Sequence, residues 1–266
     1  MIATPSSENT FGTLTGLTVI IQGEGTISLH SNGVLLRVGD GQTLVVRDVT
    51  LKGRDNNTNS VVWIDIGGTF RMEGRAAVSN NIRTSEGSGG VANNGTFSMQ
   101  DNTSVSGNTG RGSYGGGVGT SNGTFIMRDN ATVSGNTSQG YDGGGVNVGS
   151  GTFTMQDSAT VSGNTSQGYG DGGGVYVGGG TFSMTGNATV SGNTSDGNGG
   201  GVFVEVRGTF TKRGGTIYGS NETDANLRNT AHQGHAIYDA RNNGRWRGST
   251  AGPTMNPEAF GFWLND

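Results

Sequence analysis

Three aspartates at equivalent places along the chain are the first residues whose type and spacing could do chemistry. Asp101, Asp129 and Asp157 are evenly spaced, and each stands two residues after a methionine. Carboxylates stacked in this way can share a calcium ion or work as an acid–base pair. Gly186 takes the next equivalent position, and aspartate in such a motif is also a common turn residue. We therefore predict turn aspartates and keep a carboxylate site as the alternative.

The other polar candidates are scattered. Aspartates of the glycine-rich segments resemble a calcium-binding nonapeptide only faintly, because they stand much farther apart than nine positions, at Asp142, Asp171 and Asp196. The three histidines are too few for a metal site and stand at His30, His232 and His235. A basic and aromatic cluster that could stack on sugars or nucleic acid comprises Arg241, Arg245, Trp246 and Arg247. We predict solvated loops and a solvated cap, with no metal and no cofactor.

Tyrosines recur in the segments before the glycine runs. The segments TGRGSYG, TSQGYDG and TSQGYGDG carry Tyr114, Tyr141 and Tyr169. We predict that these segments are exposed loops on one edge of the molecule. Tyrosine, serine and glycine together make adaptable recognition surfaces, and loops on a rigid scaffold often carry function. The sequence thus predicts a repeated contact strip for a glycan or a protein.

The candidates recur because most of the chain is a repeat. The phenylalanine of each Gly-Thr-Phe motif marks the period, at Phe70, Phe97, Phe125, Phe153, Phe182 and Phe210. The numbers of successive markers differ by 27 to 29, and the Val-Ser-Gly-Asn motif and its equivalents keep nearly the same spacing. A period of this length is typical of a solenoid or a propeller. Because a propeller blade needs four strands and about 40 residues, the shorter unit favours a solenoid.

Each unit contains three short strands. Apolar residues alternate with a period of two, for example at Val175 and Val177 and at Phe182 and Met184. The connections are rich in Gly, Asn, Asp and Ser, which favour tight turns. Such short strands form a core only by stacking on identical neighbours. We therefore predict an all-β chain, a right-handed parallel β-helix of three sheets with about 28 residues per coil and eight to nine coils.

Stacking would place equivalent residues above one another. The phenylalanines would form an internal column, and burial of each would contribute about 1.5–3 kcal/mol. A second column occupies the corner after the third strand, with members Asn81, Asn108, Asn136, Asn164 and Asn193. We predict that these amides form an internal ladder in which each side chain bonds to the next.

The ends of the repeat differ from its middle. The interval from Val34 to Val62 equals one period, which extends the pattern toward the start. Because solenoid ends need atypical capping units, we predict a cap over residues 1–16, repeats over 17–234, and a last partial coil with a cap over 235–266. The apolar residues expected to cover the open ends are Phe11, Leu14, Leu17, Trp246, Phe260, Phe262 and Trp263.

The composition of the chain limits its possible binding partners and its cellular location. The 266 residues include 54 glycines and no cysteine, and no apolar run approaches the roughly 20 residues of a membrane-spanning helix. A net charge of −4 gives no broad attraction for nucleic acid or anionic membranes. No signal peptide is visible, so the residues alone indicate a cytosolic chain or a mature fragment. We expect a monomer with no nucleic-acid partner and no membrane span.

Outward threonines are one more regular feature. They precede the phenylalanines, at Thr69, Thr96, Thr124, Thr152, Thr181 and Thr209. Flat threonine columns can bind ice, but Arg71 and Ile126 interrupt the neighbouring column, and threonine is a favoured exposed strand residue.

The pairing of Gly-Gly-Gly-Val with Val-Ser-Gly-Asn resembles the polymorphic outer-membrane protein repeat of bacterial autotransporter passengers. The first motif is matched at 143–146, 172–175 and 199–202, and the second at 133–136, 161–164 and 190–193, with valine in place of phenylalanine. The chain is also similar to spirochaete-type surface repeat proteins. The resemblance implies a right-handed β-helix displayed on or released from the cell surface, often as an adhesin.

These observations lead to three hypotheses about function. The first is a non-enzymatic cell-surface or secreted repeat protein that binds a host protein or glycan through the tyrosine loops. The second is a polysaccharide lyase or hydrolase on a pectate-lyase-like β-helix, which a cluster of three or more carboxylates on one sheet would indicate. An ice-binding solenoid is the third.

Overall fold

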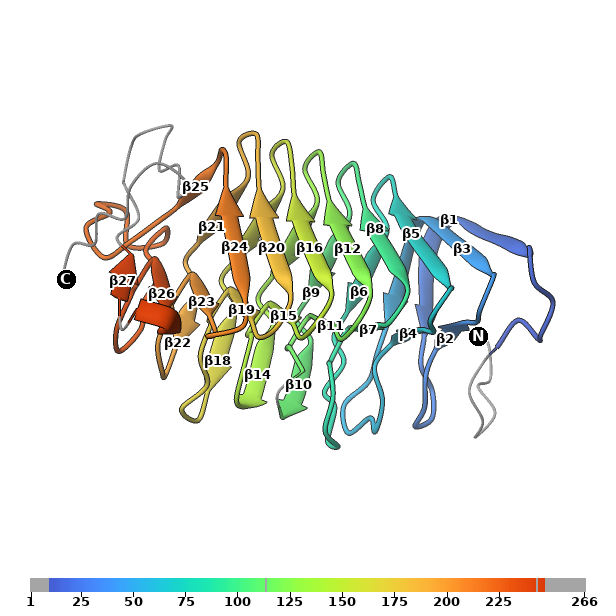
Figure 1. Cartoon of the computed structure of the whole chain (residues 1–266). Coiled ribbons are helices and arrows are strands. Elements are labelled where there is room, and N and C mark those ends of the chain that lie inside the picture. The colour runs from blue at the N-terminus through green and yellow to red at the C-terminus, as the bar shows by residue number, and fades with distance from the viewer. Residues whose placement is uncertain (1–9, 113, 243, 247–266) are drawn as a thin grey trace.

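Short strands separated by turns follow the alternation of the sequence, and equivalent strands of successive coils pair in parallel. The computed structural model describes residues 10–112, 114–242 and 244–246. They form an all-β solenoid of about seven turns, with equivalent residues about 28 positions apart (Figure 1). The predicted parallel β-helix is confirmed. The expected eight to nine coils exceed the observed number because the rungs at the two ends are incomplete.

The first face of the solenoid is a nine-stranded sheet built from the short strands that follow the glycine runs. Its strands are β2 (Leu36–Val38), β4 (Val62–Ile64), β7 (Val91–Asn93), β11 (Val118–Thr120), β15 (Val146–Val148), β19 (Val175–Val177), β23 (Val202–Val204), β26 (Ile237–Asp239) and β27 (Gly244–Trp246). Two side chains of each central strand point into the core, and the residue between them faces outward.

The second face carries the Gly-Thr-Phe motif. Its strands are β1 (Thr18–Ser28), β3 (Thr43–Lys52), β5 (Thr69–Glu73), β8 (Thr96–Met99), β12 (Thr124–Met127), β16 (Thr152–Met155), β20 (Thr181–Met184) and β24 (Thr209–Lys212). The phenylalanine rings from Phe70 to Phe210 stack in one buried column, with neighbouring centroids 4.7–5.1 Å apart.

The third face carries the Val-Ser-Gly-Asn motif. Its strands are β6 (Ala77–Ser79), β9 (Ser104–Ser106), β13 (Thr132–Ser134), β17 (Thr160–Ser162), β21 (Thr189–Ser191) and β25 (Thr216–Ile217). Strand β3 belongs to two faces, because its first half pairs with β5 and its second half with β6. The second and third faces therefore form one 14-stranded sheet.

A fourth, short sheet departs from the prediction. The segments after the asparagines, which we expected to be exposed loops, form β10 (Thr109–Gly112), β14 (Thr137–Gly140), β18 (Thr165–Gln167) and β22 (Thr194–Ser195). Ser138, Ser166 and Ser195 point inward and are buried. Their hydroxyls bond to carbonyl oxygens of the adjoining turns, as from Ser166 to Tyr141 at 2.5 Å. This strand alternates like the others, but with small polar residues instead of apolar ones.

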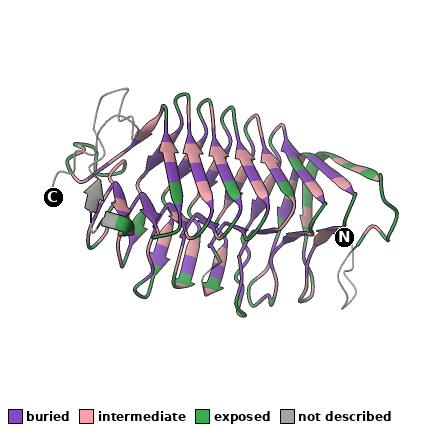
Figure 2. Cartoon of the chain, in the orientation of Figure 1, coloured by how far each residue is buried: buried purple, intermediate pink, exposed green. Residues whose placement is uncertain are grey.

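One core runs along the whole solenoid because like residues stack on like. Phe153 pairs in register with Phe125 and Phe182, and the adjacent methionines align in the same way. Figure 2 shows the buried residues recurring at the same place in each successive coil. Buried residues from Leu29 to Ile237 form a single hydrophobic cluster.

The first coil is shorter than the period. Val34 was expected in the column of Val62, but Leu36 pairs with Val62, and Leu44 pairs with Phe70, so this coil is two residues short at both places. A shift of two residues along a strand leaves the same side of the strand inward. Alternation alone therefore could not reveal it.

The asparagine column lies in a fully buried corner. The side-chain nitrogen of Asn136 donates to Asn164 Oδ1 at 3.0 Å, and that of Asn164 donates to Asn193 Oδ1 at 2.9 Å. The main-chain N–H groups of Asn136 and Asn164 donate to the same oxygens. The column also includes two residues outside the repeat motif, Asn57 at the N-terminal end and Asn229 at the other.

We expect Asn164→Ala to lower the free energy of unfolding by about 1–3 kcal/mol. The substitution removes the acceptor of two Asn136 N–H groups and a donor to Asn193 Oδ1 in a fully buried corner. Urea denaturation measures the loss. The control is the exposed Asn130→Ala, which should stay within about 0.5 kcal/mol of the native protein. Equal midpoints for both variants would show that the ladder does not stabilise the coil.

The two ends close differently. Thr10 forms an isolated bridge with Arg37, and Phe11 packs against the core. Leu14, expected to cover the first coil, is 66% exposed, because Gln42 Nε2 bonds to its carbonyl oxygen and fixes its segment as a surface turn. At the other end, β27 pairs antiparallel with β26 after the 3-10 helix η1 (Ala240–Asn242). Trp246 lies in β27, whereas Phe260, Phe262 and Trp263 lie outside the described residues.

Candidate functional site

An outward column of side chains runs along the nine-stranded sheet, and we call it the outer column. Its members occupy the middle of successive strands and pair in register: Arg37, Trp63, Ala92, Gly119, Asn147, Tyr176, Phe203 and Tyr238. The strands that carry them lie side by side along the solenoid (Figure 1). Aromatic residues therefore stand toward both ends of one face, with Ala92, Gly119 and Asn147 between them.

Trp63 is held in place by two charged neighbours. Its indole Nε1 donates to Asp65 Oδ1 at 3.1 Å, and the same carboxylate binds Arg37 through two hydrogen bonds of 2.8 and 2.9 Å. The hydrogen bond to Asp65 raises the pKa of Arg37 above its ordinary value. Because Trp63 is half-buried and its polar edge is fixed, the indole forms a rigid platform at the surface.

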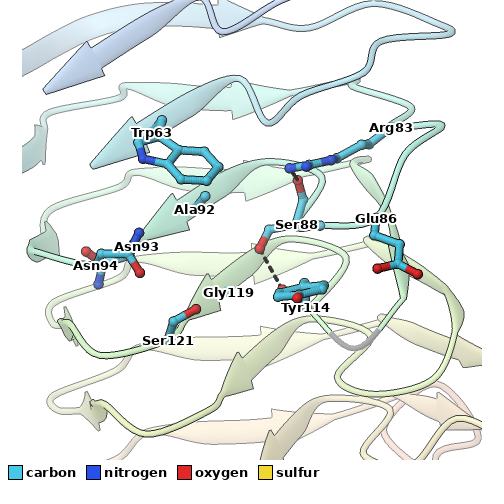
Figure 3. A pocket seen from close by; sticks show the side chains of 11 residues that line it. Trp63, Arg83, Glu86, Ser88, Ala92, Asn93, Asn94, Tyr114, Gly119 and Ser121 are labelled. Carbon is cyan, nitrogen blue, oxygen red and sulfur yellow. Dashed lines mark hydrogen bonds between the residues drawn. The ribbon is translucent and has the colours of Figure 1, made fainter. Parts of the chain in front are cut away.

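A hollow of about 230 Å³ opens beside Trp63 (Figure 3). Ala92 and Gly119 contribute no bulk to it, and Trp63 and Tyr114 line it from different segments. The remaining lining includes the half-buried Asn94 and the exposed Ser121 and Glu86. The hollow thus combines aromatic surface with hydrogen-bonding groups, as ligand sites commonly do.

Gly119 is required at the floor of this hollow. A Cβ there would lie 2.1 Å from Ser88 Oγ and 2.2 Å from the carbonyl oxygen of Tyr114. Ser88 Oγ donates a hydrogen bond of 2.6 Å to that oxygen, which holds the backbone of Tyr114 over the sheet. The missing side chain of Gly119 therefore lets the Tyr114 segment come down to the sheet.

Arg83 brings a positive charge to the same hollow. Arg83 points inward and is only 9% exposed. The equivalent position is held by Gly110 in the next coil and by Ser138 in the coil after that. Nη1 donates to Ser60 Oγ at 3.0 Å and to the Ser88 carbonyl oxygen at 3.4 Å. Burial lowers the pKa of Arg83.

A second aromatic group lies toward the C-terminal end of the outer column. The rings of Tyr176, Phe203 and Tyr238 stack with centroids 5.4 Å apart at each step. The Tyr176 hydroxyl donates to Glu205 Oε1 at 3.4 Å. Burial, followed by the charges of nearby carboxylates, raises the pKa of Tyr176 and keeps its phenol neutral.

The three tyrosines expected to form a contact strip are all exposed at the surface, each to a different degree. Tyr114 is 45% exposed and lines the hollow, whereas Tyr141 and Tyr169 are 60% and 91% exposed on turns. Tyr169 also has a positive φ of 72°. Among the described residues, no stacked pair joins any two of the three.

The repeated aspartates act as turn residues. Asp101, Asp129 and Asp157 adopt the left-handed conformation, with φ of 53° to 56°. The carboxylate of each accepts a hydrogen bond from a main-chain N–H of the preceding coil, as from Asp101 to Asp129 at 3.1 Å. Gly186 continues the column with φ 65°. The aspartates therefore recur at equivalent positions because each of them forms the same turn.

Three other polar candidates of the sequence make contacts within the fold. Asp171 accepts a hydrogen bond from the Asn198 N–H, and His235 Nδ1 accepts one from the Ala231 N–H. Arg241 pairs with the buried Asp239, and Arg247 lies outside the described residues. Within the described part of the chain, no group of three or more His, Asp or Glu side chains is arranged to hold a metal ion.

The outward threonines align in register from Thr69 to Thr209 along the second face. Neighbouring hydroxyls make weak contacts, for example 3.3 Å between Thr152 and Thr124. The adjacent column contains Arg71 and Ile126, also in register.

The sequence analysis did not predict the outer column, because it considered the two inward valines of each strand of the nine-stranded sheet and not the outward residue between them. The available signal was the aromatic identity of Trp63, Tyr176 and Phe203 at an outward position. Arg83 carried a second signal, since an arginine there stands where later repeats have glycine or serine, two residues after the asparagine.

Comparisons of the chain with protein-family models, with curated proteins and with solved structures gave no significant match. In the residues that the structure describes, no helix is long and apolar enough to cross a membrane.

Proposed function

We propose that this chain is a non-catalytic binding protein that takes a saccharide along the outer column. The observation that carries the proposal is the placement of the half-buried Trp63, Tyr176 and Tyr238 on one face of one sheet, with Phe203 buried between the two tyrosines. Rigid aromatic surfaces with polar groups beside them suit the mixed apolar and hydroxyl surface of sugar rings. Trp63 and Tyr176 are four coils apart, roughly 19 Å at the usual strand spacing, and the Tyr114 segment lies over Gly119 between them. A linear oligosaccharide of this length would therefore contact the two aromatic groups by passing over the Tyr114 segment.

The repeats also favour a cellular location for this binding. Their resemblance to autotransporter passengers favours a cell-surface or secreted protein, and a rigid solenoid suits an adhesin because it presents the same face over many coils. A host-cell glycan is then the partner that the outer column favours over a protein.

We expect Trp63→Ala to weaken the binding of an oligosaccharide selected on a glycan array by about tenfold or more. Aromatic anchors of this kind contribute about 2 kcal/mol, and each 1.4 kcal/mol is a factor of ten in affinity. Isothermal titration calorimetry measures the loss. Tryptophan fluorescence is a second readout, because Trp63 is one of three tryptophans in the chain.

The matched control is the double variant Tyr141→Ser with Tyr169→Ser, which removes two exposed rings away from the outer column. It should bind like the native protein. If the double variant loses binding while Trp63→Ala keeps it, the tyrosine strip is the site and the outer column is not. Release of shortened or unsaturated sugars during the titration would replace the binding proposal with a polysaccharide-cleaving enzyme.

A further inference from the structure

The hollow beside Trp63 contains a buried positive charge without a counter-charge. Arg83 forms no ion pair within the part of the chain that the structure describes, and its protein acceptors are the Ser60 and Ser85 hydroxyls and the Ser88 carbonyl oxygen. Glu86 also lines the hollow, but it is exposed and makes no ion pair with Arg83 in this region. Burial of an unbalanced cation is costly, so such an arginine is uncommon without a role.

The guanidinium also keeps a donor for a ligand. Nε and Nη1 are occupied by the serine contacts, whereas Nη2 has no acceptor among the described residues. In the described chain, the one buried side-chain polar atom without a hydrogen-bond partner is Thr120 Oγ1. Nη2 of Arg83 has no partner there either, so it is accessible from outside. Figure 3 shows the guanidinium pointing toward Trp63 across the hollow. The guanidinium that carries the free donor therefore borders the hollow.

We infer that this hollow accepts the carboxylate of an acidic sugar, with Arg83 as the counter-ion and Trp63 as the platform for the sugar ring. The inference rests on the proposed saccharide binding and narrows its ligand to uronic-acid-type sugars. A planar guanidinium matches the two oxygens of a carboxylate, and charge-assisted hydrogen bonds are about twice as strong as neutral ones. The volume of about 230 Å³ suits a single sugar unit at this end of the column.

The test compares a charged ligand with its neutral ester on the native protein. Glucuronic- and galacturonic-acid disaccharides and their methyl esters are titrated by calorimetry, together with neutral disaccharides. We expect the acids to bind about tenfold to a hundredfold more tightly than the esters, and added sodium chloride to weaken the acids more than the esters.

Two variants assign the effect to Arg83. Arg83→Met should reduce the preference for the acid to less than twofold, while its urea midpoint is equal to or above that of the native protein, since it removes an unbalanced buried charge. Arg83→Lys keeps the charge without the planar fork and should retain part of the preference.

The outcomes separate this inference from the proposed function. Equal binding of acids and esters, with Trp63→Ala still weakening both, overturns the role of Arg83 and leaves saccharide binding standing. An acid preference that survives Arg83→Met also overturns the inference, because another group then reads the charge. If neither the acids, the esters nor the neutral sugars bind, both proposals fail.

Discussion

Phe153→Ala should lower the free energy of unfolding by about 3–5 kcal/mol. The ring is fully buried and lies between two others, with centroid distances of 4.7 Å to Phe125 and 4.8 Å to Phe182. Removing it leaves a cavity in the middle of the column, which the β-ladders on both sides prevent from closing. Urea denaturation followed by far-UV circular dichroism measures the change.

The matched control is Phe210→Ala at the end of the same column. Phe210 is 9% exposed and stacks on one described ring, that of Phe182, at 5.0 Å and with a tilt of 23°. Its loss should therefore be smaller than that of Phe153. Equal losses at both positions would show that the benefit comes from burying each ring alone and not from the continuous column.

The coil architecture was accessible from the sequence because each element of one coil repeats in the next. A strand that offers two inward side chains has no stable position by itself, so a regular period of apolar pairs leaves stacking as the solution. The same argument predicted the columns of Phe153 and Asn164. It did not fix the first coil, where pairing of Leu36 with Val62 shortens the period by two residues and leaves the alternation unchanged.

The fourth sheet was not accessible in this way because its inward residues are serines. The buried Ser138 and Ser166 donate hydrogen bonds to main-chain carbonyl oxygens, and a pattern of apolar alternation does not detect such a strand. Arg83 points inward because its segment continues the register of this sheet through the bridge between Ile82 and Thr109. A sequence pattern that treats arginine as solvated cannot place it in an interior corner.

The candidate site depended on loop lengths that the period conceals. Tyr114, Tyr141 and Tyr169 precede the first valine of the following strand by four, five and six residues, so successive insertions carry them to different positions. Only the shortest of these loops brings its tyrosine down over Gly119, where Ser88 holds it. Tyrosines at the same place in the repeat therefore differ in exposure, from 45% at Tyr114 to 91% at Tyr169.

Gly144→Ala should lower the free energy of unfolding by about 3 kcal/mol, the upper end of the usual cost of overpacking. Gly144 is the middle residue of a three-glycine run. A Cβ there would lie 2.3 Å from the carbonyl oxygen of Gly173 and 2.5 Å from the carbonyl carbon of Thr165. Both atoms are backbone, so relief requires the neighbouring coil to move and its hydrogen bonds, such as that from the Gly144 N–H to Gly172, to stretch.

Gly149→Ala provides the control because it makes the same chemical change in the same coil. Its nearest atom would be Ser121 Cα at 3.5 Å, an ordinary contact, and the change should stay within about 1 kcal/mol of the native stability. A large loss for Gly144 beside a small one for Gly149 would show that the glycine run sets the spacing between coils. That spacing also fixes the registration of Trp63, Gly119 and Tyr176 on the outer face, so a Gly144→Ala protein that still folds should bind the selected oligosaccharide more weakly. Similar urea midpoints for the two variants would mean that the coils can separate locally, and the glycine run would then be a feature of the turn alone.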